Sequence, residues 1–346
     1  MATKEIVLLK MGTVAATAAA AINITDATLA NVVVQNTTAL TAKGLTNIGG
    51  MCVDYSGNIY VTDYAQHIIL KLTEGGVVTT VAGQRGVSGN NSALQNVKAS
   101  TAALFNAPKG IACDKSGNLY VADSGNNQIR IINNGLVSVL AGNGAQTAGL
   151  VDAAANPLQA QFNNPTDVAV DNAGNIFVCD TGNHAIRRIT GGSVLNICGG
   201  AQGDGENCRA TSVTGVNAIF HSPTGVTVDV AGIVYVMDSG NKKIKQLTPK
   251  GWVYLYSGSG STGRSLGTAP KQGYTCSYEG MVALRCDRTG RLYLLDSGSS
   301  VARLLRIDRL GAPAVVVDFS TATSAATGLK ALAVSPAEKI FVGIII

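Results

Sequence analysis

A short pattern that occurs five times constrains this chain more than any other feature of its sequence. An apolar run ends in an aspartate, a stretch containing glycine follows, and a second apolar run ends in another aspartate nine residues after the first. The first aspartates are 60, 57, 58 and 58 residues apart. Such a regular period indicates one structural unit repeated along the chain. The copies are MCVDYSGNIYVTD (51–63), IACDKSGNLYVAD (111–123), VAVDNAGNIFVCD (168–180), VTVDVAGIVYVMD (226–238) and LRCDRTGRLYLLD (284–296).

Each copy predicts a β-hairpin followed by two more strands. The glycine supplies the positive φ of a tight turn, and the Tyr-Val or Phe-Val after it begins a strand. After the second aspartate, a Ser-Gly-Asn or Thr-Gly-Asn turn precedes two further apolar segments in the clearest copies. A degenerate sixth copy, LAVSPAEKIFVGI (332–344), has Ser335 and Ile344 in place of the aspartates. Four-stranded units repeated around an axis form a β-propeller, so the sequence predicts an all-β fold with six blades.

Two of the repeats resemble the NHL repeat family. They read FNAPKGIACDKSGNLYVADSGNNQIRIINNGLVSVLAG (105–142) and FNNPTDVAVDNAGNIFVCDTGNHAIRRITGGSVLNICGG (162–200). The resemblance extends over about residues 45–346 and implies a six-bladed propeller of NHL type. It implies much less about function, because NHL propellers serve as lyases, RNA-binding modules, receptor sensor domains and protein-binding platforms.

The two ends of the chain are predicted to share the last blade. The sixth copy stops after its second strand, and LLKMGTVAAT (8–17) resembles the later half of the first repeat, ILKLTEGGVVTT (69–80). A sheet completed in this way leaves no open edge. We therefore expect a single domain over 1–346, in which 1–17 complete the last blade, 18–46 connect, and 47–346 hold the repeats.

The segment IVLLKMGTVAATAAAA (6–21) has an alternative interpretation as a secretory signal, because it is apolar and ends in small residues. Glu5 and Lys10 count against that interpretation. No apolar run reaches the roughly 18 residues that a transmembrane helix needs. We expect a protein that is neither secreted nor inserted in a membrane, and that resides in the cytoplasm or in a virion.

The seven cysteines indicate neither a zinc site nor a disulfide framework, because their number is odd and no C-x-x-C occurs. Four of them lie in predicted strands next to the repeat aspartates, where small buried thiols are expected. Among the remaining three, Cys198, Cys208 and Cys276, one pair could form a bridge.

Enzymatic chemistry is not favoured by the residues available. A metal-dependent lyase needs several converging histidines, whereas His67 and His184 occupy the same position in separate repeats and His221 stands alone. A calcium-dependent lactonase needs several oxygen ligands, and the innermost strands offer only Asp167, with Glu279 nearby. We predict no catalytic, cofactor-binding or metal-binding residue and no cofactor, and we expect the repeated aspartates to bind turn amides.

Nucleic-acid binding is also not favoured. The long segments between blades, 84–107, 143–164, 199–222 and 257–279, carry net charges of +2, −1, −1 and +1. Basic residues fall instead on or near predicted third strands, where they are expected to be solvated or to lie between blades. A nucleic-acid footprint should form one coherent stripe.

With enzymatic and nucleic-acid-binding roles not favoured, we expect a structural or protein-binding module. It should dock on its partner through the face that bears the long loops. The sequence suggests a bacteriophage virion component, such as a capsid decoration or tail-associated protein, as one subunit of a larger assembly. The alternative is a bacterial scaffold or surface protein that binds protein, glycan or RNA, and a metal-dependent lyase or lactonase ranks below both. The candidate partner-binding residues in the loops are Arg85, Phe105, Phe162, Arg264 and Tyr274.

Overall fold

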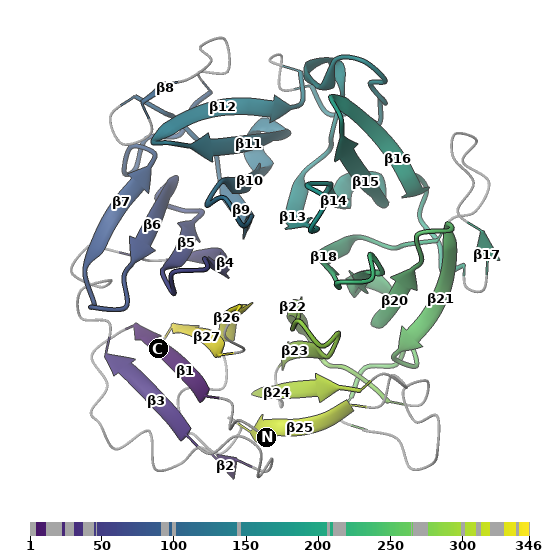
Figure 1. Ribbon diagram of the computed structural model, residues 1–346. Coiled ribbons are helices and arrows are strands. Elements are labelled where there is room, and N and C mark those ends of the chain that lie inside the picture. The colour runs from purple at the N-terminus through teal and green to yellow at the C-terminus, as the bar shows by residue number, and fades with distance from the viewer. Residues whose placement is uncertain are drawn as a thin grey trace.

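The strands form six sheets arranged in a ring around a central axis (Figure 1). This arrangement confirms the prediction of an all-β propeller. In the described part of the chain, helical structure is limited to three-residue 3-10 turns. The computed structural model describes residues 5–11, 23–24, 31–36, 45, 47–90, 97–98, 102–143, 147–205, 208–209, 219–263, 265, 276–298, 302–308, 313–318, 329–336 and 339–345.

Five of the sheets are antiparallel blades, each built from four strands that follow one another in the chain. We number these blades 1 to 5 in chain order. They contain β4 (Ile48–Val53), β5 (Ile59–Asp63), β6 (Ile68–Leu72) and β7 (Val78–Ala82); β9 (Pro108–Cys113), β10 (Leu119–Asp123), β11 (Gln128–Asn133) and β12 (Leu136–Ala141); β13 (Pro165–Val170), β14 (Ile176–Asp180), β15 (Ala185–Thr190) and β16 (Ser193–Gly199); β18 (Pro223–Val228), β19 (Val234–Asp238), β20 (Lys243–Leu247) and β21 (Trp252–Ser257); and β22 (Met281–Cys286), β23 (Leu292–Ser297), β24 (Ala302–Ile307) and β25 (Pro313–Asp318).

The first aspartate of each repeat shapes the turn between the first two strands of its blade. In blade 1, Asp54 Oδ1 accepts hydrogen bonds from the backbone N–H groups of Ser56 and Asn58, at 2.9 and 2.8 Å. Gly57 takes the positive φ of 81° that the turn requires. The Tyr60 hydroxyl donates to Asp54 Oδ2 at 3.1 Å, which ties the turn to the second strand. The prediction that these aspartates bind turn amides is confirmed.

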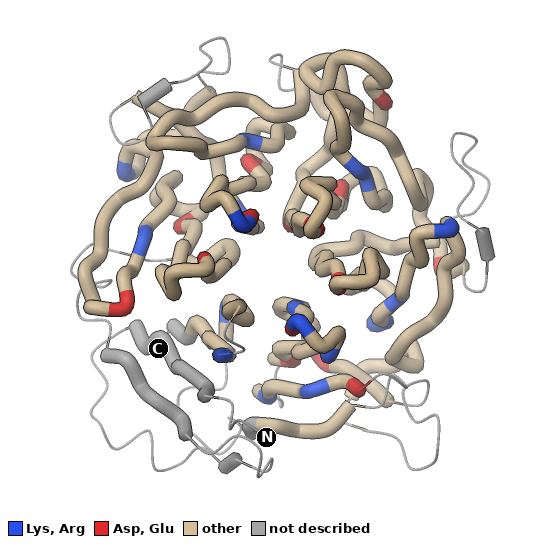
Figure 2. Tube along the Cα trace, viewed as in Figure 1, with Lys and Arg blue, Asp and Glu red and all other residues tan. Residues whose placement is uncertain are grey.

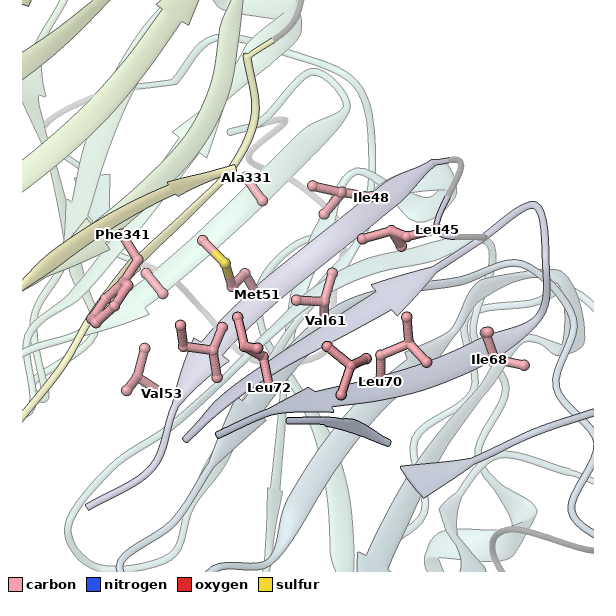
Figure 3. Packing of buried hydrophobic residues seen from close by; sticks show 13 residues of the cluster. Leu45, Ile48, Met51, Val53, Val61, Ile68, Leu70, Leu72, Ala331 and Phe341 are labelled. Atoms are coloured by element: carbon pink, nitrogen blue, oxygen red, sulfur yellow. The ribbon is translucent and has the colours of Figure 1, made fainter. Parts of the chain in front are cut away.

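Apolar side chains fill the wedges between neighbouring sheets. In the cluster shown in Figure 3, Met51 and Val53 of blade 1 pack with Ala331 and Phe341 of the last sheet. Similar clusters join the other neighbouring sheets, so each sheet buries apolar residues against the next one around the ring.

The sixth sheet, which we call the closing sheet, contains strands from both ends of the chain (Figure 1). Its order is β26 (Leu329–Val334), β27 (Ile340–Ile345), β1 (Glu5–Met11) and β3 (Asn31–Asn36). Strand β1 pairs with β27 in a register that joins Ile6 to Ile340 and Met11 to Ile345. This pairing confirms the prediction that the two ends of the chain meet in one sheet.

The closing sheet is not a sixth copy of the blade, so the prediction of a six-bladed propeller is wrong: the structure has five blades and a closing sheet. Strand β1 runs parallel to β27, and β3 runs parallel to β1, whereas the third strand of every blade is antiparallel to its neighbours. The outer position belongs to β3, which comes from the segment 18–46 expected to be only a connection. The stretch 12–22 contains one glycine and no Asn, Asp or Pro, so it lacks the residues that specify a tight hairpin. Residues 12–17 lie outside the described part of the chain.

Several segments between blades run along the outer edge of the blade that follows. Strand β8 (Val97–Lys98) pairs with β12, and β17 (Cys208–Arg209) pairs with β21. In blade 3, Ala153 bridges to Val194 of β16 in the same way. Strand β2 (Asn23–Ile24), from the N-terminal segment, covers β25 of blade 5. These short strands shield outer edges that would otherwise be available to other chains.

Candidate functional site

The second aspartate of blades 2 to 5 is buried and paired with a basic residue seven positions later. In blade 3, Asp180 Oδ2 lies 2.9 Å from the Arg187 guanidinium, and neither side chain is exposed. Burial raises the pKa of Asp180 to about 6, and the Arg187 charge acts in the opposite direction. We call these pairs the anchoring pairs. They are Asp123–Arg130, Asp180–Arg187, Asp238–Lys245 and Asp296–Arg303.

The sequence had suggested that basic residues on third strands are solvated or lie between blades, and for these four that expectation is wrong. Each reaches back across its hairpin to the aspartate at the end of the second strand. The cost of burying the charge is offset by this pairing and by further hydrogen bonds. The only available sequence signal was the recurrence of Asp and Lys or Arg at a spacing of seven residues in four repeats.

The anchoring pairs fix the ends of the long loops. The Arg187 guanidinium donates to the Gln161 carbonyl at 2.8 Å and lies 5.1 Å from the centre of the Phe162 ring. Asp180 also accepts the backbone N–H of Asn163 at 2.7 Å. Blade 2 repeats this arrangement with Arg130 over Phe105, and blade 4 repeats it with Lys245 over Phe220.

Phe105 and Phe162 are therefore not partner-binding residues at the surface of the loops. Both side chains are fully buried, and each packs on the cation of an anchoring pair. Both residues were predicted in loops because they precede the first strand of a blade. At that position the loop ends and its phenylalanine side chain packs inside the protein. Arg85 is exposed on its loop, as expected, and Arg264 and Tyr274 lie outside the described residues.

The start of the loop before blades 2, 3 and 4 is held by the 3-10 turn that follows the second aspartate of that blade. Asn183, in η4 (Thr181–Asn183), donates to the Gly149 carbonyl at 2.7 Å and to Asp180 at 2.8 Å. The Gly149 N–H donates to the Phe162 carbonyl at 3.1 Å, which joins the two ends of the loop. Asn126 and Asn241 hold Gly89 and Gly203 in the same way in blades 2 and 4.

The loop of blade 3 exposes three large apolar side chains. Leu150, Val151 and Leu158 are 39%, 45% and 38% exposed. They account for three of the ten large exposed apolar residues in the described part of the chain. No sequence prediction pointed to these three residues. Apolar residues in a Gly/Ala/Asn-rich loop segment were the available sign that they would be exposed.

An ion pair in the central channel joins blades 3 and 5, which lie on either side of blade 4. Arg285 of β22 donates to both carboxylate oxygens of Asp167 in β13, at 2.8 and 3.2 Å. Burial lowers the pKa of Arg285, but the neighbouring Asp167 carboxylate outweighs this effect and leaves it above its ordinary value. Asp167, the carboxylate that the sequence analysis singled out in the channel, is thus bound to a guanidinium. The described residues contain no group of three or more His, Cys, Asp or Glu side chains placed to hold a metal ion.

Two histidines join neighbouring blades. His67 and His184 follow equivalent turns in a left-handed conformation, with φ of 58° and 53°. Their Nδ1 atoms accept the backbone N–H groups of Ala107 and Ser222 at 3.0 and 2.9 Å, and Asn127 makes the same kind of link in blade 2. Burial, and then the nearby His221 ring at 5.9 Å, lower the pKa of His184.

The basic residues of the described chain do not gather into one stripe. Figure 2 shows Lys and Arg positions distributed over several blades. This distribution differs from the coherent footprint expected of a nucleic-acid interface. The described residues also include no helix long and apolar enough to cross a membrane.

Comparisons with known proteins agree with the repeat pattern. The model of the NHL repeat matches residues 105–132 and 162–189. Teneurin-3 of Mus musculus is 26% identical over 225 residues, which are 59% of this chain and 8% of the relative. The chain therefore spans only a small part of the length of the curated relatives that it matches.

Solved structures share the fold at low sequence identity. A gluconolactonase from Xanthomonas campestris has a TM-score of 0.55 and 14% identity, covering 86% of this chain and 82% of that one. A chain of a nidogen–laminin complex has a TM-score of 0.52 and 16% identity, covering 86% and 84%. These similarities show the β-propeller fold, and the matched segments show that the chain contains NHL repeats.

Proposed function

We propose that this propeller is a non-enzymatic module that binds other proteins through the loop of blade 3. The observation that carries the proposal is the exposure of Leu150, Val151 and Leu158 on that one loop. Apolar anchors surrounded by small polar residues are a common composition for a protein interface.

The backbone that carries these side chains is fixed. Arg187 donates to the Val151 carbonyl and to Asp152, both at 2.8 Å, and Ala153 pairs with Val194 of β16. Asn156 accepts the Leu158 N–H at 3.1 Å and so caps the 3-10 turn η3 (Pro157–Gln159). A surface held in one conformation loses little entropy on binding, which favours affinity.

The relatives are compatible with more than one function. One neighbour with this fold was solved in a nidogen–laminin complex, which supports a binding role, and another is a gluconolactonase. Against a lactonase, the carboxylate of Asp167 is engaged by Arg285. A virion role gains no support from the relatives, so the proposal covers protein binding in general and is not specific to a phage particle.

The test compares two double variants in cells of the natural source. Leu150→Ser/Leu158→Ser changes the proposed surface, and Val77→Ser/Val230→Ser is the matched control, because its residues are also exposed but lie in turns of blades 1 and 4. Chemical cross-linking and mass spectrometry should show a partner that the first variant loses at least tenfold and the control retains, while both keep the wild-type Tm.

An unchanged partner set in the loop variant would contradict the proposed surface. Hydrolysis of a lactone that a chelator abolishes would contradict the non-enzymatic role and favour a metalloenzyme.

A further inference from the structure

Two cysteine thiols from adjacent blades meet inside the channel. Cys52 of β4 and Cys113 of β9 both line a cavity of about 210 Å³ there. Both side chains belong to the apolar cluster between blades 1 and 2, and Cys113 Sγ donates to the carbonyl of Val53, the residue next to Cys52, at 3.1 Å.

Close packing of two innermost strands brings these thiols together. A Cβ atom on Gly50 would lie 2.9 Å from the Lys109 carbonyl oxygen and 3.0 Å from Gly110 Cα, so β4 and β9 touch through their backbones. Cys52 lies two positions before the first aspartate of its repeat, and Cys113 lies one position before the aspartate of the next repeat. Because successive strand residues face opposite sides, this offset turns the two side chains toward the same cluster between blades 1 and 2.

We propose that Cys52 and Cys113 form a redox-active dithiol that closes to a disulfide between blades 1 and 2 when a peroxide enters the channel. The two residues differ in access, because Cys113 is half-buried and Cys52 is buried. Cys113 is therefore the thiol that meets the oxidant, and Cys52 is the thiol that completes the bond.

The reaction has two steps. The Cys113 thiolate attacks one peroxide oxygen, an S–O bond forms, the O–O bond breaks and hydroxide leaves. The Cys52 sulfur then attacks the Cys113 sulfenic sulfur, an S–S bond forms, the S–O bond breaks, and water leaves with the Cys52 proton. The two thiols lose two electrons in total, and hydrogen peroxide is reduced to two molecules of water.

The chain contains its own matched control in blade 5. Cys286 occupies the position of Cys113, and its Sγ donates to the Val228 carbonyl at 3.2 Å, as Cys113 Sγ does to Val53. The position of Cys52 in the preceding blade is held by Thr227, whose Oγ1 accepts the backbone N–H of Cys286 at 3.1 Å. Cys286 therefore shares the setting of Cys113 but has a hydroxyl where Cys113 has a thiol.

The experiment counts thiols before and after oxidation. The reduced full chain is treated briefly with hydrogen peroxide, denatured and alkylated, and its peptides are mapped by mass spectrometry. Five of the seven cysteines should be alkylated, Cys52 and Cys113 should appear as one cross-linked peptide pair, and dithiothreitol should restore seven. Seven alkylated cysteines after peroxide, or a disulfide between other residues, would overturn the proposal.

Four variants test the assignment further. Cys52→Ala and Cys113→Ala should each abolish the disulfide, whereas Cys286→Ala should leave it unchanged. Thr227→Cys should create a second disulfide, with Cys286, because it recreates the offset of the natural pair. Absence of this second disulfide in a folded variant would contradict the geometric argument, and the peptide map of the wild-type chain decides the outcome if the alanine variants do not fold.

Discussion

The five blades and the closing sheet perform the same task in the ring but are specified in different ways. In a blade, each strand pairs with the next strand in the chain, and the first aspartate of the repeat shapes the turn between the first two strands. In the closing sheet, Ile6 pairs with Ile340, and Ser335 and Ile344 replace the two repeat aspartates. The difference shows that local turn signals determine the blades, whereas the closing sheet depends on contacts between distant segments.

The largest expected effect comes from removing the N-terminal half of the closing sheet. Deletion of residues 1–18 removes β1 and exposes the edge of β27, whose Phe341 belongs to the apolar cluster against blade 1. We expect aggregation, or a loss of stability beyond the roughly 4–5 kcal/mol that marks exceptional point mutations. Thermal unfolding and size-exclusion chromatography measure the effect.

Deletion of residues 1–4, which precede β1, is the control for this truncation and should leave the Tm close to that of the full chain. A variant without residues 1–18 that stays soluble with an unchanged Tm would show that the pairing of β1 with β27 contributes little.

The next effect tests the anchoring pairs. Asp180→Ala removes one of the two carboxylates paired with the buried Arg187 charge, the one that is itself fully buried, and should cost about 3–5 kcal/mol. Asp63→Ala in blade 1 is the comparison, because Leu70 occupies the position of the cation there, and it should cost about 1–2 kcal/mol. Urea unfolding of both variants checks the order, and equal losses would contradict the role assigned to the cation.

A smaller effect compares the first turn of a blade with that of the closing sheet. Among the described residues, Asp54 accepts four hydrogen bonds, whereas Ser335 Oγ accepts one, from the Lys339 N–H at 3.0 Å. Asp54→Ala should therefore cost about 1–2 kcal/mol and Ser335→Ala about 0.5–1 kcal/mol. The two variants can be ranked by their urea midpoints, and the reverse ranking would show that the closing sheet depends on its turn more than the blades do.

The smallest effect is a dependence on pH at the link between blades 3 and 4. The pKa of His184 is lowered in the folded protein, so the unfolded chain binds the proton first as the pH falls. Stability from this group is complete above its unfolded pKa and decreases below it, because a protonated Nδ1 cannot accept the Ser222 N–H. His184→Asn, which copies Asn127 of blade 2, should reduce the fall in Tm between pH 7 and 5 relative to wild type.

The sequence predicted the parts of the fold that depend on short-range signals. The hairpins, the role of Asp54 and its equivalents and the meeting of the chain ends all follow from turn residues and from the incomplete sixth repeat. It did not predict the parallel pairing of β1 with β27, because no residue near β1 specifies its direction.

The candidate site was less predictable, because it buries residue types that are usually exposed in loops and on strands. An arginine on a strand is usually solvated, but Arg187 is buried. It contacts Asp180, Asp152 and the Gln161 carbonyl, which come from separate segments. Phe162 was expected to be exposed because it lies in a predicted loop, but its ring packs on the Arg187 guanidinium. A single sequence indicates each residue type but not which of them converge.

The parallel contact between β1 and β27 has a consequence for biosynthesis. During translation β1 can pair with β3 early, but its other edge has no partner in the sheet until β27 has been made. All five blades can form before that moment, since each uses only strands that are consecutive in the chain. Ring closure is then the last and slowest folding event, because it joins the segments with the greatest sequence separation.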